Sequence, residues 1–125
     1  MRILNLVLGA FMVLFAAVQY NDPDGPLWAA LYAVPAFWAG LAGLKPAMLQ
    51  AALAKAGLAA SLVLYLVLTV VYWPAEAAWW RMDIWWESEE SREGMGLMIC
   101  SAVIAAAGLS MLLGRSRPAP AGGRA

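Results

Sequence analysis

The chain has 125 residues, 64% of them hydrophobic, and its eight basic and eight acidic side chains cancel to a formal net charge of zero. This composition is typical of an integral membrane protein and leaves room for one domain. The lack of histidine excludes imidazole-ligated haem, zinc or copper and any Ser–His or Cys–His catalytic machinery, and a single cysteine, Cys100, excludes a disulfide framework. We expect Cys100 to be a small packing residue.

Four apolar runs without a charged residue have the length of transmembrane helices. They cover residues 3–20, 27–44, 56–73 and 94–113. At about 1.5 Å rise per residue, each spans roughly the 30 Å hydrocarbon core of a bilayer. The first run is longer than a usual signal core of about 7–15 residues, so we expect a span and not a cleaved leader. The prediction is an all-α integral membrane bundle of four transmembrane helices plus a short interfacial helix, with the transmembrane domain covering residues 1–113.

The charges are sorted between alternate connecting segments. One set of segments carries six basic residues and no acid: Arg2, Lys45, Lys55, Arg115, Arg117 and Arg124. The other set carries all the acids and two bases: Asp22, Asp24, Glu76, Asp83, Glu87, Glu89, Glu90 and Glu93, with Arg81 and Arg92. Because Lys and Arg stay on the cytoplasmic side, this predicts a multi-pass plasma-membrane protein with both termini cytoplasmic. The Ala-rich composition makes the bacterial inner membrane the expected location.

Turn-forming residues fill the segment between the first two spans. Its sequence is Asn-Asp-Pro-Asp-Gly-Pro over residues 21–26, in which Pro23 fixes its own φ and Gly25 is free to adopt a positive one. Six residues join only antiparallel neighbours, so spans one and two should form a hairpin. Within span two, Pro35 removes one backbone hydrogen bond.

Four mildly polar side chains lie at membrane depth. They are Ser61, Tyr65, Thr69 and Ser101, and we expect them to make hydrogen bonds between helices. Pairs of small residues four apart in spans two, three and four favour a compact bundle, without identifying the contacting faces. No ionisable group lies inside a span, which argues against a proton-coupled monomeric transporter.

Aromatic residues gather in the segment between spans three and four and at the adjacent span ends: Tyr20, Trp28, Tyr72, Trp73, Trp79, Trp80, Trp85 and Trp86. The charge spacing predicts an interfacial helix over residues 75–87. It serves either as an aromatic belt that fixes membrane depth or as a shelf for a lipid or sterol.

The Pro/Gly/Arg-rich residues 114–125 are expected to form a disordered cytoplasmic tail.

Two acidic clusters are predicted to meet on the outer face, one at the first turn and one at the start of span four. Three interpretations stay open. In the first, Arg92 forms a structural ion pair with Asp22 or Asp24. In the second, the carboxylates bind Ca²⁺, Mg²⁺ or Mn²⁺. In the third, Glu93 or Asp22 acts as an acid or base on a lipid-linked substrate. The metal ligands would be Asp22, Asp24, Glu89 and Glu93, with the Asn21 amide as a further donor.

Two sequence blocks resemble the signature of a known family. The first is Gln19-x-Asn21-Asp22-Pro23-Asp24-x-x-x-Trp28-x-x-x-Tyr32-x-x-Pro35-Ala36, and the second is Glu89-Glu90-x-Arg92-Glu93-x-x-Gly96-Leu97-x-Ile99. They are similar to the transmembrane protein 220 family, small multi-span proteins without an assigned activity. The resemblance implies that the two clusters form one feature. Binding or structural roles would fall to Gln19, Asn21, Trp28, Tyr32, Glu90 and Arg92.

The expected function is a non-enzymatic binding or assembly protein whose outer acidic site takes a divalent cation or a basic group of a partner. One alternative is an interfacial enzyme acting on a lipid or lipid-linked substrate. The other is a purely structural Arg–carboxylate lock without a ligand. Membrane lipids are the expected partners, with a homo-oligomer or a membrane-protein partner left open, and no nucleic acid.

The charge asymmetry predicts the outcome of cysteine labelling. In a Cys100→Ser background, Pro23→Cys should react with an impermeant maleimide on intact cells, and Arg117→Cys should react only after permeabilisation, because Lys and Arg remain cytoplasmic. The opposite pattern of labelling would contradict the predicted orientation.

Overall fold

The computed structural model describes residues 1–21, 23–73 and 89–116, and the regular structure in these residues is all helical. In chain order the elements are α1 (Arg2–Ala17), η1 (Val18–Asn21), α2 (Gly25–Leu44), η2 (Pro46–Gln50), α3 (Ala52–Tyr72) and α5 (Glu89–Ser116). The all-α prediction is therefore confirmed. The predicted interfacial helix over residues 75–87 lies outside the described residues.

The described residues contain four helices long and apolar enough to cross a membrane: Arg2–Asn21, Gly25–Leu44, Ala52–Tyr72 and Arg92–Gly114. Two of them start or end away from the expected apolar runs. Helix α3 already begins at Ala52 and includes Lys55, whose long stem can lie along the bilayer while its amine reaches water. Helix α5 runs through Ser116, so the expected disorder does not begin at residue 114. These two helices thus continue past the charge-free runs where polar residues of adequate helix propensity adjoin them.

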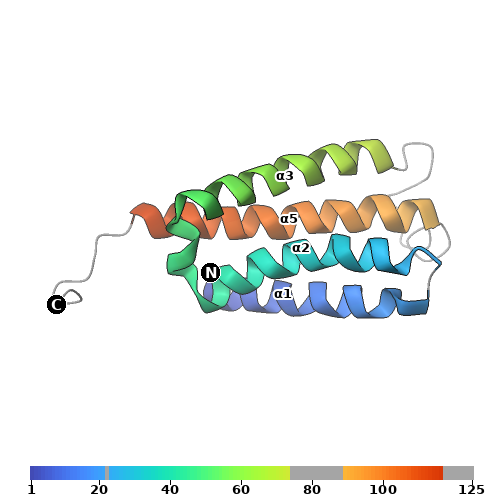
Figure 1. Ribbon diagram of the computed structural model, residues 1–125, viewed down its shortest axis with the longest axis horizontal. Coiled ribbons are helices and arrows are strands. Elements are labelled where there is room, and N and C mark those ends of the chain that lie inside the picture. Colours follow the sequence, from blue (N-terminus) through green and yellow to red (C-terminus); the bar gives the residue numbers. More distant parts are fainter. Residues whose placement is uncertain (22, 74–88, 117–125) are drawn as a thin grey trace.

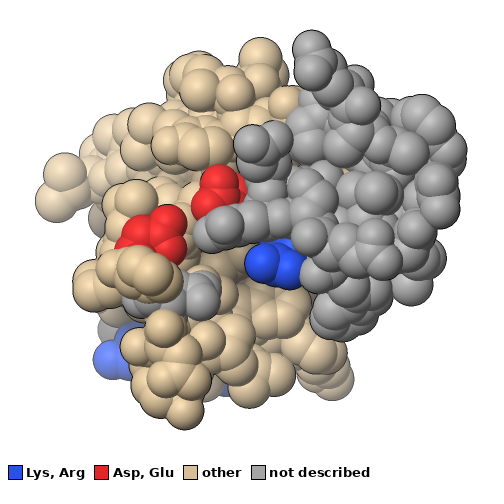
Figure 2. Space-filling model, turned by 90° about the vertical axis from the view of Figure 1, so that its right-hand side faces the viewer, with Lys and Arg blue, Asp and Glu red and all other residues tan. Residues whose placement is uncertain are grey.

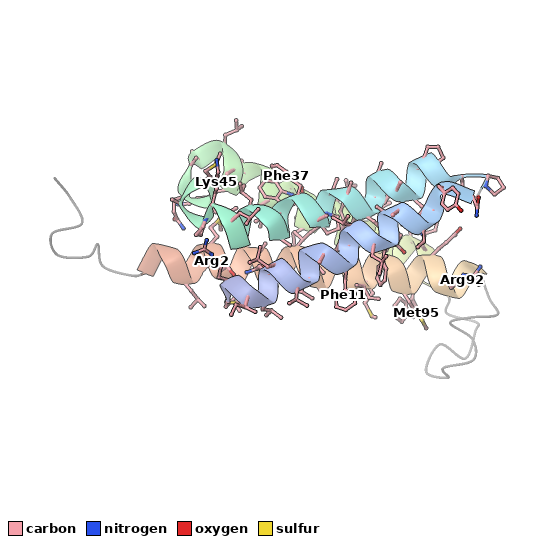
Figure 3. All side chains as sticks on the ribbon, turned by 90° about the horizontal axis from the view of Figure 1, so that it is seen from below. Arg2, Phe11, Phe37, Lys45, Arg92 and Met95 are labelled. Carbon is pink, nitrogen blue, oxygen red and sulfur yellow. The ribbon has the colours of Figure 1, made fainter. Side chains whose placement is uncertain are left out.

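The four helices lie side by side and run alternately up and down (Figure 1). Helix α1 packs on α2, α3 packs on α5, and α5 contacts all three other long helices. One end of the bundle holds the starts of α2 and α5 and is called the acidic end, because Asp24 and Glu93 lie there. The other end, where α1 and α3 begin, is called the basic end. Figure 3 shows Arg2 and Lys45 at the basic end and Arg92 at the opposite one.

Burial divides the helices into an inner and an outer pair. The apolar windows of α2 and α5 are each 39% buried, against 17% for α1 and 11% for α3. The core contains α5 residues such as Leu97 and Ile104, both fully buried, together with Met12 and Tyr65 from the outer pair. Large apolar side chains cover the outward faces of α1 and α3, among them Ile3 and Val70, each 78% exposed. In a bilayer these faces contact acyl chains, because hydrocarbon is the only solvent at that depth.

A buried backbone carbonyl links α2 to α3. Pro35 has no N–H, so the carbonyl of Leu31, four residues earlier, loses its helical partner. The Tyr65 hydroxyl of α3 donates to this oxygen at 2.7 Å, and the Cys100 thiol of α5 approaches it at 3.8 Å. A carbonyl without a partner is costly in hydrocarbon, so Tyr65 replaces the bond that the proline removed.

Further hydrogen bonds join neighbouring helices, as expected for the polar residues of the spans. Trp38 Nε1 donates to Ser61 Oγ at 3.0 Å, and Thr69 Oγ1 lies 3.1 Å from Ser101 Oγ. An additional bond runs from Asn5 Nδ2 to Ser110 Oγ at 2.7 Å. Each of these bonds connects residues far apart in the chain, and together they set which helix faces meet.

We predict that Tyr65→Phe lowers the free energy of unfolding by about 1 kcal/mol, because the Leu31 carbonyl loses its donor. In a Pro35→Ala background the loss should shrink, since the introduced alanine supplies a backbone N–H to the same oxygen. Reversible unfolding in mixed micelles measures both effects. Tyr72→Phe, on the same helix but 44% exposed, is the matched control and should be near neutral. An equal loss from Tyr65→Phe in both backgrounds would contradict this role.

Candidate functional site

At the start of α2, the acidic residue Asp24 interacts with a tryptophan one helical turn later. Asp24 is the N-cap residue, but its carboxylate makes no capping bond to the backbone. Instead Asp24 Oδ2 accepts a hydrogen bond from Trp28 Nε1 at 3.0 Å. The indole is buried, with 6% of its surface exposed, while Asp24 is exposed. The bond satisfies a buried donor and fixes an exposed carboxylate at the acidic end.

Aromatic contacts tie this corner to two other helices. The Trp28 ring meets Tyr72 of α3 edge-on, with ring centroids 6.1 Å apart at 81°. The Tyr32 ring meets Phe15 of α1 in the same manner, at 5.6 Å and 74°. Edge-to-face pairs of this kind add about 0.5–1.5 kcal/mol beyond the burial of their area. The start of α2 is therefore held from both sides.

The two sequence blocks meet where Tyr32 packs on α5. The Tyr32 hydroxyl lies directly against Gly96, so that a Cβ at this position would overlap the hydroxyl oxygen. Glu93 lies about one turn earlier than Gly96 on α5. This contact joins the two sequence blocks, because Tyr32 belongs to the first block and Gly96 to the second. That the two acidic clusters form one feature stays a prediction.

Gly25 has a different role from the expected one. Its φ does not lie in the left-handed region, so the freedom of glycine to adopt a positive φ is not used here. Gly25 is instead buried against the backbone carbonyl of Gln19, where a Cβ has no room. The Gln19 side chain turns back and donates from Nε2 to the Phe15 carbonyl at 3.1 Å. The turn is compact because the start of α2 touches the backbone of η1.

Among the described side chains, Asp24, Arg92 and Glu93 carry the charge of the acidic end. Figure 2 looks onto this end and shows acidic groups close to one another, with a basic group beside them. Asp22 lies outside the described residues. The backbone of Glu89 and Glu90 forms the first turn of α5, but their side chains are outside the description. Asn21 ends η1 and is exposed.

The described residues do not themselves complete a metal site. No group of three or more His, Cys, Asp or Glu side chains within residues 1–21, 23–73 and 89–116 could hold an ion. The ligand set predicted from the sequence therefore depends on Asp22 and Glu89 as well as on Asp24 and Glu93.

Sequence reasoning missed some of the contacts that position the acidic end. Phe15 packs on Tyr32 of the first block, and an apolar residue in a span carries no local signal of such a contact. Gly25 and Tyr72 were noted for turn chemistry and for the aromatic group, and not for their contacts with Gln19 and Trp28. The signal for Asn5 was available, because it is an amide inside an otherwise apolar run.

Matches to known proteins cover the part of the chain in which these contacts occur. A protein-family model described as "Transmembrane family 220, helix" matches residues 11–108. The chain belongs to this transmembrane protein 220 family. Transmembrane protein 220 of Xenopus laevis is 40% identical over 45 residues, which make up 36% of this chain and 24% of that protein. The matched segment thus spans about a quarter of that relative. No solved structure matches.

The Xenopus relative comes from a eukaryote, which does not favour the expected bacterial inner membrane.

We predict that Gly96→Ala destabilises the protein by about 1–3 kcal/mol, because the new methyl group meets the Tyr32 hydroxyl in a packed core. Adding Tyr32→Phe to Gly96→Ala should recover most of the lost stability, because it removes the hydroxyl oxygen that the new methyl group overlaps. Gly40→Ala is the control, since nothing lies within 4 Å of a Cβ there; it should be neutral or slightly stabilising. Thermal unfolding in detergent compares the variants, and a Tyr32→Phe/Gly96→Ala double variant no better than Gly96→Ala would contradict the proposed contact.

Proposed function

We propose that the protein is a non-enzymatic membrane protein that binds or assembles through its acidic end. In this proposal, carboxylates from the first turn and from the start of α5 together hold a divalent cation or a basic group of a membrane partner. The observation that carries the proposal is the packing of Tyr32 on Gly96, one turn after Glu93 on α5, since it joins the two sequence blocks.

The chemistry of the residues suits a hard cation. Ca²⁺, Mg²⁺ and Mn²⁺ prefer carboxylate and amide oxygens, which Asp24, Glu93 and Asn21 offer at this end. In this proposal the remaining ligands are Asp22, which follows Asn21 in the chain, and Glu89, which precedes Glu93 by four residues. Carboxylates held close together favour a bound cation because it relieves their mutual repulsion.

Binding is favoured over covalent catalysis by the state of the nucleophilic side chains. The chain has no histidine to serve as a base. Each of three described span hydroxyls is engaged with the backbone of its own helix: Ser61 donates to Gly57, Ser101 to Leu97, and Ser110 to Ala106. Cys100 is buried in the core. Hydroxyls used in this way serve packing between helices and not attack on a substrate.

A structural lock is the second candidate, and one specific contact favours it. Asp24 already accepts a hydrogen bond from Trp28, so one oxygen of this carboxylate is stabilised by a donor within the protein. Arg92, at the same end, can neutralise a further carboxylate (Figure 3). In this alternative the acidic end fastens the α1–α2 turn to α5 and takes no ligand.

We predict that detergent-purified protein binds one Ca²⁺ or Mn²⁺ ion at millimolar concentration and unfolds at a higher temperature when loaded, because a ligand of the native state stabilises it. Asp24→Asn and Glu93→Gln should each weaken binding by at least about tenfold, since affinity follows the number of charged ligands. Asp83→Asn removes an acid outside the proposed ligand set and should leave affinity unchanged. Native mass spectrometry and thermal unfolding supply the two measurements.

The alternatives give different results in the same experiment. If no ion binds and Asp24→Asn lowers the unfolding temperature, the structural lock replaces the binding site. If a lipid extract is converted by the protein and Glu93→Gln abolishes the conversion, the chain is an interfacial enzyme and the non-enzymatic proposal is wrong.

A further inference from the structure

The basic end contains a pocket that belongs to neither sequence block. Its volume is about 240 Å³, and it lies between the start of α1, the end of α2 and the end of α5. Its lining includes the buried Ala42 and the half-buried Ser110, together with the exposed residues Met1, Arg2 and Leu113, which we call its rim. The volume is roughly eight times the ~30 Å³ that a water molecule occupies in the liquid, which is enough for a phosphate with its ester oxygens.

Arg2 gives this pocket a fixed positive charge. Its Nε donates to the Gly43 carbonyl at 2.6 Å, near the C-terminal end of α2. A guanidinium carries five N–H donors, so this bond occupies one of them and the terminal nitrogens keep theirs for a ligand. Lys45, exposed two residues after Gly43, lies at the same end (Figure 3). Helix α1 begins at Arg2, and the unpaired N–H groups of its first turn add positive potential there.

A buried polar cluster holds the wall of the pocket in place. Asn5 is completely buried, and its Nδ2 donates both to the Met1 carbonyl at 2.9 Å and to Ser110 Oγ at 2.7 Å. Both acceptors belong to residues that line the pocket. Within the described residues Asn5 Oδ1 has no hydrogen-bond partner, which is costly at a buried position. This end of the bundle therefore retains polar groups that packing alone would not require.

We propose that this pocket binds the phosphate of an anionic phospholipid from the surrounding leaflet. The Arg2 guanidinium and the start of α1 would hold the phosphate oxygens, with Lys45 contributing long-range attraction. The apolar rim at Leu113 borders the outward faces of the bundle, along which the acyl chains would run. Basic pockets between transmembrane helices are suited to such head groups, because Arg binds phosphate with paired hydrogen bonds. The site lies at the opposite end from the acidic end and does not depend on the function proposed for it.

Native mass spectrometry of the full chain tests the proposal directly. Protein is exchanged into detergent doped with phosphatidylglycerol or with phosphatidylcholine of the same acyl chains, and the bound lipid is counted. We expect one phosphatidylglycerol to bind about tenfold more tightly than phosphatidylcholine, because the choline cation brings a positive charge close to Arg2 and Lys45 while both lipids carry the phosphate. The bound lipid should also survive millimolar inorganic phosphate, because the acyl chains add contacts that the free anion lacks.

Two variants and their controls assign the lipid to this pocket. Arg2→Gln removes the charge, and Leu113→Trp fills the rim without changing any charge. Each should lower phosphatidylglycerol occupancy by about tenfold. Lys55→Gln removes a base of the same end that does not line the pocket, and Leu112→Trp places the same bulk on the adjacent exposed position. Both controls should retain the lipid. An unchanged unfolding temperature of Leu113→Trp separates lost binding from lost fold.

Three results would overturn the proposal. Equal binding of the two lipids would remove the role of the anionic charge. Full occupancy in both Arg2→Gln and Leu113→Trp would place the lipid elsewhere. Displacement of the lipid by inorganic phosphate would identify a site for a free anion in place of a phospholipid.

Discussion

The satisfaction of one backbone carbonyl in hydrocarbon orients three of the four long helices in the described bundle. Pro35 leaves the Leu31 oxygen without its helical partner at a depth where water cannot replace it. The Tyr65 hydroxyl provides the missing donor from α3, and the Cys100 thiol approaches from α5. Three helices are thereby oriented around one oxygen atom. The Trp38–Ser61 bond, two turns further along α2, keeps the same faces of α2 and α3 together.

The acidic end uses the same principle with larger side chains. Trp28 and Tyr32 each carry one polar atom, and each atom has a defined place: the indole N–H on Asp24 and the hydroxyl against Gly96. The rings fill the space between helices, while the polar atoms fix their orientation. The charged acidic end is thus supported by an aromatic layer, which contacts α1 through Phe15, α3 through Tyr72 and α5 through Gly96.

Much of the fold could be predicted from the sequence, because the bilayer imposes simple rules on length and polarity. Charge-free runs of sufficient length identified the four helices, and the mild polar residues were correctly expected to join them. The ends were less predictable, since α5 continues beyond the expected apolar run at both ends. Lys55 and Ser116 are compatible with either helix or loop, and local propensity does not decide between them.

The candidate site was predictable only in part, for a physical reason. The two family blocks identified Tyr32, Glu93 and Gly96. The contact between the Tyr32 hydroxyl and Gly96 arises only when α2 packs on α5, so neither block predicts it alone. Gly25 illustrates the same limit: its small size is used against the Gln19 carbonyl, whereas turn chemistry suggested its backbone freedom. The pocket at Arg2 arises from three helix ends and has no local signature in the chain.

The unequal burial of the helices has a consequence for how such a sequence can diverge. The outward faces of α1 and α3 meet fluid acyl chains, which accept any apolar shape, so Leu, Ile, Val and Phe can exchange there without altering the fold. Helices α2 and α5 pack against other helices on more sides. Side-chain substitutions there are restricted by the volume of the packed interior and by the hydrogen bonds of individual polar atoms. Lineages of this protein should therefore drift fastest along α1 and α3 and keep their recognisable residues on the inner pair and its adjoining turn, where both family blocks lie.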